Sequence, residues 1–178
     1  MHIMTPPIPM PTKREPHGYL GIDPGASGGL ALIRGSTIRV STMPETMLEI
    51  WDLVYGSSLC GPPFRTHAII EKVHSMPKQG VTSAFTFGKG YGMLLMALTA
   101  ASIPYEEIRP EVWQKYLSIS PRKKGEAKPL LKLRLLNKAQ QLFPLLPLWK
   151  KPKSKGEQLA VCDALLIAEY CRRTRTGG

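Results

Sequence analysis

Cysteine is scarce in this chain, and the few cysteines are not spaced for zinc binding or for a disulfide framework. The 178 residues contain only Cys60, Cys162 and Cys171. The number is odd, and the spacings fit no zinc-binding pattern. Cys162 and Cys171 fall within one predicted helix. We therefore expect reduced thiols in a reducing compartment and no disulfide framework.

Long apolar runs and an export signal are also missing. No apolar stretch approaches the length of a membrane-spanning helix. The first 17 residues are rich in proline and carry no charged segment followed by an apolar one. They are also poor in serine and arginine, which disfavours an organellar transit segment. We expect a cytoplasmic protein with no membrane partner, in which residues 1–17 form a disordered basic arm and residues 18–178 form a single domain.

Acidic residues are outnumbered by basic ones. The chain has 13 Asp and Glu against 24 Lys and Arg, a formal net charge of +11 at pH 7. A surplus of this size indicates a polyanionic partner, and nucleic acid is the usual one. The length suits one domain with a full core and is short for two.

Hydrophobic periodicity predicts alternating strands and helices. The predicted strands are Tyr19–Asp23, Leu30–Arg34, Thr37–Thr42, His67–Val73 and Tyr105–Ile108. The predicted helices are Glu45–Tyr55, Val81–Ala101, Pro110–Leu117, Lys128–Phe143 and Glu157–Arg173. Gly35-Ser36 predicts a two-residue hairpin of type II′. This order fits an α/β fold with a mixed five-stranded sheet, three antiparallel strands followed by parallel ones, flanked by helices.

Two of the predicted strands end on an acidic residue. Asp23 closes Leu20-Gly21-Ile22-Asp23, and Glu71 closes Ile69-Ile70-Glu71. If these strands are adjacent and parallel, both carboxylates emerge at one edge of the sheet. Like charges at short range raise each other's pKa unless a cation lies between them, and oxygen ligands favour Mg²⁺ or Mn²⁺. The alternative for Asp23 is an ordinary turn, because Asp-Pro-Gly is common turn chemistry.

A third acid, Asp163, interrupts the apolar helical segment 159–170. An acid in such a stretch is costly to bury unless it is paired or bound to metal. Two strand-end acids and one helical acid would suit a two-metal site, which activates a water and stabilises the leaving oxygen of a phosphodiester. The alternative is a partly exposed Asp at the margin of the helix.

Three segments together resemble the acidic motifs of RuvC-type Holliday junction resolvases, most closely the phage and bacterial branch. They are Gly21-Ile22-Asp23-Pro24-Gly25, Ile70-Glu71-Lys72-Val73 and Ala160-x-x-Asp163-Ala164, and Arg109-Pro110-x-x-Trp113 adds to the likeness. The likeness runs from about residue 18 to residue 173.

The resemblance implies an RNase H-like nuclease domain, a homodimer and a role in DNA recombination and repair. The implied reaction is symmetric Mg²⁺-dependent nicking of a four-way DNA junction, leaving 5′-phosphate and 3′-hydroxyl ends that a ligase can seal. It implies two Mg²⁺ per active site, with Mn²⁺ as a substitute, and no nucleotide cofactor. The compartment would be the cytoplasm of a bacterium or a phage-infected cell.

The chain departs from the resembled pattern near Asp163. The family carries a fourth carboxylate or a histidine three or four residues upstream, where this chain has Ala160 and Leu159. Glu157 is the nearest upstream acid, and on a continuous helix it points about 120° away from Asp163. Glu157 reaches the site only if the helix begins just after it. Otherwise it is a first-turn acid favoured by the helix dipole, and water or a backbone oxygen completes the second metal's shell.

Lys132 heads the predicted inward stripe of its helix, followed by Leu136, Ala139 and Phe143. Members of the resembled family carry a basic residue at the start of this helix that contacts the scissile phosphate, and Lys132 is the best match. The alternative is a lysine that extends its amine to solvent.

Further basic and aromatic residues are candidates for DNA contacts. Phe85 is a candidate wedge against unstacked bases, with core packing as the alternative. For Gly88, Gly90 and Gly92, close packing on the sheet is favoured over a close approach of the helix backbone to DNA. The basic candidates, each with solvated surface as the alternative, are Lys72, Lys78, Lys89, Arg122, Lys123, Lys124 and Lys128.

Other functions compete with junction resolution. A related RuvC-like nuclease could act on structured RNA, and a catalytically weak protein could bind junctions without cutting them. Actin-like phosphotransferases also open on Gly-Ile-Asp-x-Gly, but they need a second lobe for which 178 residues leave no room.

Overall fold

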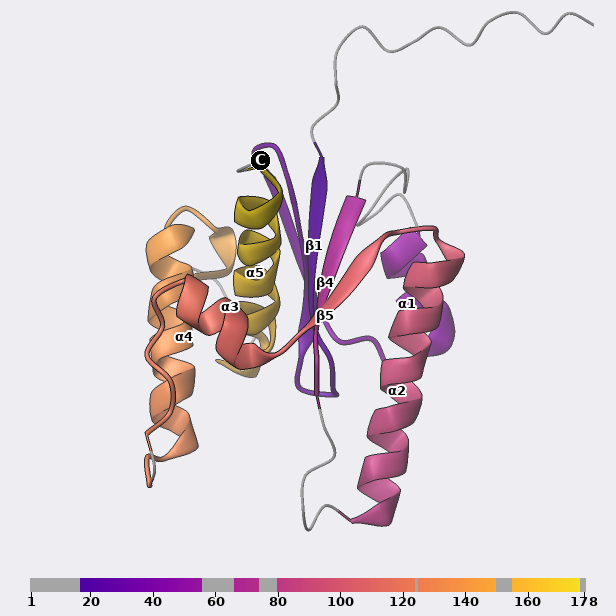
Figure 1. Cartoon of the computed structure of the whole chain (residues 1–178), viewed down its shortest axis with the longest axis horizontal. Helices are drawn as coiled ribbons and strands as arrows, with labels where there is room; N and C mark the ends of the chain where they lie inside the picture. Colours follow the sequence, from indigo (N-terminus) through magenta and orange to yellow (C-terminus); the bar gives the residue numbers. More distant parts are fainter. Residues whose placement is uncertain (1–16, 56–65, 74–79, 124, 150–154, 177–178) are drawn as a thin grey trace, which may run out of the picture.

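The architecture is a mixed five-stranded sheet with helices on both faces (Figure 1). It comes from a computed structural model that describes residues 17–55, 66–73, 80–123, 125–149 and 155–176. The strand order is β3-β2-β1-β4-β5, in which β1, β2 and β3 are antiparallel and β4 and β5 run parallel to β1. The strands span Gly18–Asp23 (β1), Gly29–Arg34 (β2), Thr37–Thr42 (β3), Thr66–Glu71 (β4) and Tyr105–Ile108 (β5). The predicted fold class is confirmed.

The hairpin between β2 and β3 has the predicted two-residue loop. Arg34 pairs with Thr37 across the turn, and Gly35 has a φ of 56°. A positive φ at the first central position is what a type II′ turn requires, and glycine adopts it without steric cost.

The helices divide between the two faces of the sheet. In Figure 1, α1 and α2 cover one face, while α5 lies against the other with α3 and α4 on its outer side. The helices span Met47–Tyr55 (α1), Val81–Ala100 (α2), Pro110–Tyr116 (α3), Lys128–Leu142 (α4) and Lys155–Thr176 (α5). Within the described residues, none of them combines the length and apolar character that crossing a bilayer requires.

Helix α5 runs from Lys155 to Thr176, two residues earlier and three residues later than predicted, and the shifted start of α1 has a local explanation. Helix α1 begins at Met47, two residues later than predicted, because Thr46 and Glu49 form a capping box. Glu49 N donates to Thr46 Oγ1 at 3.2 Å, and Thr46 N donates to Glu49 Oε2 at 3.0 Å. Pro147–Trp149 forms a short 3-10 helix, η2, between the two last predicted helices.

The sheet and α5 approach each other most closely at Gly21. A Cβ at this position would lie 2.2 Å from both Ala164 O and Ala168 N, which are backbone atoms of α5. Ala164 and Ala168 are themselves small and fully buried. Glycine on the strand and alanines on the helix therefore allow α5 to lie directly on β1, which places Asp163 beside the end of that strand.

Gly88, Gly90 and Gly92 do not pack closely against the sheet, so that expectation is wrong. A Cβ at any of the three would meet no described heavy atom within 4 Å. The first half of α2 is exposed: Val81 retains 87% and Phe85 retains 74% of its surface. Core packing is therefore also wrong for Phe85.

Replacing Gly21 by alanine should destabilise the fold, because the added methyl meets backbone atoms that cannot move aside. We expect the free energy of unfolding to fall by about 3 kcal/mol or more in urea denaturation. Gly90→Ala is the matched control: its methyl enters open space, and alanine gains about 1 kcal/mol of helix propensity. Equal unfolding midpoints for Gly21→Ala and the unchanged chain would contradict the packing described for α5.

Candidate active site

Two acidic side chains emerge at the same edge of the sheet. β1 and β4 are adjacent and parallel, with Ile22 paired to Ile70, so Asp23 and Glu71 occupy equivalent positions at the ends of their strands. Asp163, on α5, is 7% exposed. The charges of Asp163 and Glu71 both act on Asp23. The three acids come from segments far apart in the sequence, and they lie near enough for the charges of Asp163 and Glu71 to raise the pKa of Asp23.

Burial makes all three acids hard to ionise, and repulsion from neighbouring carboxylates adds to this effect at Asp23 and Glu71. Burial, followed by the charges of Asp163 and Glu71, raises the pKa of Asp23 to about 8. Burial also raises the pKa of Glu71 to about 7, against the effect of a hydrogen bond from Trp113. Burial raises the pKa of Asp163, while Lys132 acts in the opposite direction. Such a group of carboxylates is stabilised in its charged form by a nearby cation.

Lys132 of α4 supplies one positive charge. Its Nζ donates a hydrogen bond to Asp163 Oδ2 at 2.5 Å. Burial lowers the pKa of Lys132, but the Asp163, Asp23 and Glu71 carboxylates raise it above its usual value overall. The predicted inward stripe is present as well, because Ala139 is fully buried and Leu136 packs against the core.

The donor chemistry of the site fits a hard divalent cation. All three acids offer carboxylate oxygens, which Mg²⁺ and Mn²⁺ prefer. Asp163 Oδ1 is buried and has no hydrogen-bond partner among the described residues. Among the described residues, no group of three or more Asp, Glu, His or Cys side chains has the geometry to hold a metal ion as it is. The suitability of this site for Mg²⁺ or Mn²⁺ therefore rests on its carboxylate oxygens and on the unpaired buried Oδ1 of Asp163.

The glycine-rich turn after β1 wraps around Asp23. Gly25 has a φ of 117°, and its carbonyl accepts a hydrogen bond from Gly28 N at 2.9 Å. A Cβ at Gly28 would lie 2.0 Å from Asp23 O. Glycine is required at both positions, at Gly25 by the backbone angle and at Gly28 by the close approach.

Trp113 also belongs to the site, although its position in the sequence predicted no role there. It lies on α3, is fully buried, and donates from Nε1 to Glu71 Oε2 at 2.9 Å. One signal was available: a tryptophan on an inward helix position carries an N–H that needs an acceptor when it is buried. Its partner was not predictable, because 42 residues separate it from Glu71.

Glu157 lies inside α5, which begins at Lys155. The condition under which Glu157 would reach the site, a helix that begins just after it, is therefore not met. On this continuous helix Glu157 and Asp163 point about 120° apart. Position 160, one turn before Asp163, is a buried alanine.

The remaining candidates for DNA contacts lie at the surface where the structure describes them. Phe85 and Lys89 are exposed on α2, and Lys72 is exposed directly after Glu71. Lys78 and Lys124 lie outside the described residues. The other exposed basic candidates are Arg122, Lys123 and Lys128, which precede or begin α4.

Two solved structures of RuvC from Thermus thermophilus are similar to this chain. A structure in complex with a Holliday junction substrate has a TM-score of 0.55 at 20% identity, covering 91% of this chain and 96% of that one. A second RuvC structure has a TM-score of 0.53 at 20% identity, covering 88% and 96%. No family model and no curated protein matched. At this identity, the likeness shows that the chain has the fold of RuvC.

The raised pKa of Asp23 predicts how stability depends on pH. An acid with a higher pKa in the folded than in the unfolded chain binds more protons when folded, so stability falls as pH rises between the two values. Those values are about 8 when folded and about 4 when unfolded. We expect Asp23→Asn to stabilise the metal-free protein more at about pH 8 than at about pH 5.

The difference between the two gains should exceed about 1.4 kcal/mol, the equivalent of one pKa unit, in urea denaturation. Ser27→Ala, at an exposed position of the same turn, is the control and should change stability equally at both pH values. A gain from Asp23→Asn that is the same at both pH values would refute the electrostatic description of this site.

Proposed function

We propose that this chain is an endodeoxyribonuclease that resolves four-way DNA junctions by metal-dependent nicking. The proposal is supported by Asp23 and Glu71 at the ends of adjacent parallel strands in a RuvC-like fold, with the buried Asp163 near enough to act on Asp23. A net charge of +11 suits a polyanionic substrate. One of the similar RuvC structures is a complex with a Holliday junction substrate.

Asp23, Glu71 and Asp163 are the residues that would hold Mg²⁺, or Mn²⁺ in its place. In a site with two ions, Asp23 is the candidate for the shared ligand, since both other acids act on its carboxylate. Bound magnesium ions lower the pKa of an attacking water and neutralise charge on the leaving oxygen of a phosphodiester. The three carboxylates would hold the ions, and the limited access of water to the site would strengthen the charge interactions there.

Lys132 is proposed to contact the scissile phosphate. Its Nζ is bound to Asp163 Oδ2, and its side chain is partly exposed, so the amine lies between the buried acids and solvent. An ammonium at this place attracts the phosphate and offsets charge that develops during cleavage. Lys132 belongs to α4, whose N-terminal end follows the exposed Arg122 and Lys123.

The exposed basic residues are proposed to position the junction through its phosphates. Such contacts fix orientation without reading sequence, and their strength depends on salt concentration. Phe85 is proposed as a wedge against unstacked bases, because its ring is mostly exposed near the N-terminal end of α2.

Symmetric nicking requires two active sites, and one chain supplies one. We therefore propose a homodimer. An exposed stripe on α2 supports an interface there: Gly88, Gly92 and Met96 recur every four residues, and Met96 is 62% exposed. Glycines on a helix surface allow a second helix to approach closely.

The central test is cleavage of a synthetic four-way junction in Mg²⁺. The unchanged protein should introduce paired, symmetric nicks with ligatable ends. Asp23→Asn should bind the junction but cut it about 1,000-fold more slowly, since a lost metal ligand removes several kcal/mol of transition-state stabilisation. Asp52→Asn replaces an exposed acid of α1 and should cut normally.

Three outcomes would count against the proposal. Normal cutting by Asp23→Asn would show that the site is wrongly assigned. A preference for structured RNA by a monomeric protein would favour a different RuvC-like nuclease. Tight junction binding without cleavage in either Mg²⁺ or Mn²⁺ would favour a non-catalytic binding protein.

The dimer has its own test. Met96→Glu places a charge in the proposed α2 interface and should shift the sedimentation coefficient to that of a monomer, while cleavage changes from paired nicks to single nicks. Leu48→Glu is the matched control, since Leu48 is 68% exposed on α1, outside the stripe. A Met96→Glu protein that sediments as the unchanged chain does would exclude this interface.

A further inference from the structure

Trp113 and Glu71 form a partly buried hydrogen bond, with an uncharged donor, at the edge of the acidic site. The indole Nε1 donates to Glu71 Oε2 at 2.9 Å, and Trp113 has no exposed surface. We propose that Trp113 is a positioning residue that holds the Glu71 carboxylate in the orientation required for binding a divalent cation. The inference rests on the proposed nuclease function, because that function makes Glu71 a metal ligand.

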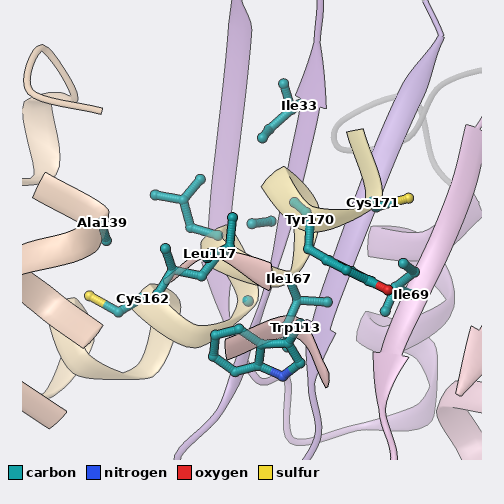
Figure 2. Packing of buried hydrophobic residues seen from close by; sticks show 14 of the residues in the cluster. Ile33, Ile69, Trp113, Leu117, Ala139, Cys162, Ile167, Tyr170 and Cys171 are labelled. Carbon is teal, nitrogen blue, oxygen red and sulfur yellow. The ribbon is translucent and has the colours of Figure 1, made fainter. Parts of the chain in front are cut away.

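The indole cannot easily change its place. It lies in the apolar cluster that also contains Leu117, Leu165 and Ile167, and Figure 2 shows its ring beside Ile167 of α5. A ring in a closely packed core keeps one rotamer, so its N–H points in a constant direction. The donor to Glu71 is therefore held by the same core that supports α5.

The sheet sets the distance between donor and acceptor. Glu71 pairs with Ile108 of β5, and Lys72 N donates to Ile108 O at 2.8 Å. Helix α3 begins at Pro110, directly after this strand, and carries Trp113 in its first turn. Only four residues thus separate Ile108 of the strand pairing from Trp113, and one of them is a proline that restricts the backbone.

Glu71 and Asp163 have different kinds of partner. Asp163 Oδ2 accepts from Lys132, a charged and partly exposed side chain that a phosphate could attract away. Glu71 Oε2 accepts from an uncharged donor inside the core. Because its indole is uncharged, Trp113 can orient Glu71 without competing with a divalent cation for the charge of the carboxylate. The second oxygen of that carboxylate then points in a defined direction.

The experiment measures Mn²⁺ affinity of the full chain by calorimetry, without DNA. Trp113→Phe keeps an apolar ring and removes the N–H donor, and we expect it to weaken Mn²⁺ binding by about 10- to 100-fold. Trp149→Phe is the matched control. Trp149 Nε1 also donates a hydrogen bond, to Phe143 O at 2.6 Å, but that acceptor is a carbonyl outside the acidic site. This control should bind Mn²⁺ as the unchanged chain does.

An isosteric replacement keeps the test decisive if Trp113→Phe does not fold. The chain contains three tryptophans, so in a Trp51→Phe, Trp149→Phe background only Trp113 remains. Biosynthetic substitution of that residue by 3-benzothienylalanine replaces N–H with sulfur at nearly constant shape. A purely structural role predicts unchanged Mn²⁺ affinity for this protein, and the proposal predicts the same loss of about 10- to 100-fold.

The outcomes separate this inference from the proposed function. If the unchanged chain binds Mn²⁺ in a manner abolished by Asp163→Asn, and loss of the indole N–H leaves that affinity within about twofold, the positioning role is wrong and the metal site stands. If the unchanged chain shows no Mn²⁺ binding that depends on Asp163, the proposed metal site and the role of Trp113 both fail.

Discussion

The contact between α5 and β1 is the constraint on which the rest of the site depends. Gly21 has no side chain, so the backbone of α5 lies where a Cβ would otherwise be, 2.2 Å from Ala164 O. This approach buries Asp163 close enough to Asp23 for its charge to raise the pKa of Asp23. A larger residue at position 21 would move the helix outward and separate the acids. The same packing that stabilises the core therefore also places Asp163 near Asp23.

The cost of this arrangement is electrostatic, and the surroundings reduce it in two ways. Burial raises the pKa values of all three carboxylates, and repulsion from neighbouring carboxylates raises those of Asp23 and Glu71 further. Lys132 offsets part of that charge through Asp163, and Trp113 stabilises charged Glu71 through a hydrogen bond. Neither partner satisfies Asp163 Oδ1. A protein that retains unfavourable charge at a surface edge is suited to binding a cation there.

Local patterns in the sequence were sufficient for the fold and insufficient for the environment of several residues. The alternation of apolar residues predicted the strands, and the order of elements predicted the mixed sheet. Boundaries shifted where a local hydrogen bond decided them, as at Thr46 and Glu49. The expectation for Gly88 failed because periodicity identifies a helix without showing how far each turn stands from the sheet. The exposure of Phe85 could not be predicted for the same reason.

The sequence by itself determined that Asp23 and Glu71 end buried strands, because alternation and chain order are local properties. It also placed Asp163 on an apolar helix. Only the tertiary structure decided which groups meet these acids, since Lys132 is 31 residues from Asp163 and Trp113 is 42 from Glu71. Such contacts depend on how helices lie against the sheet, which no spacing in the chain specifies. The hydrogen bond to Glu71 is the clearest case, because a buried indole requires some acceptor and only packing selects which one.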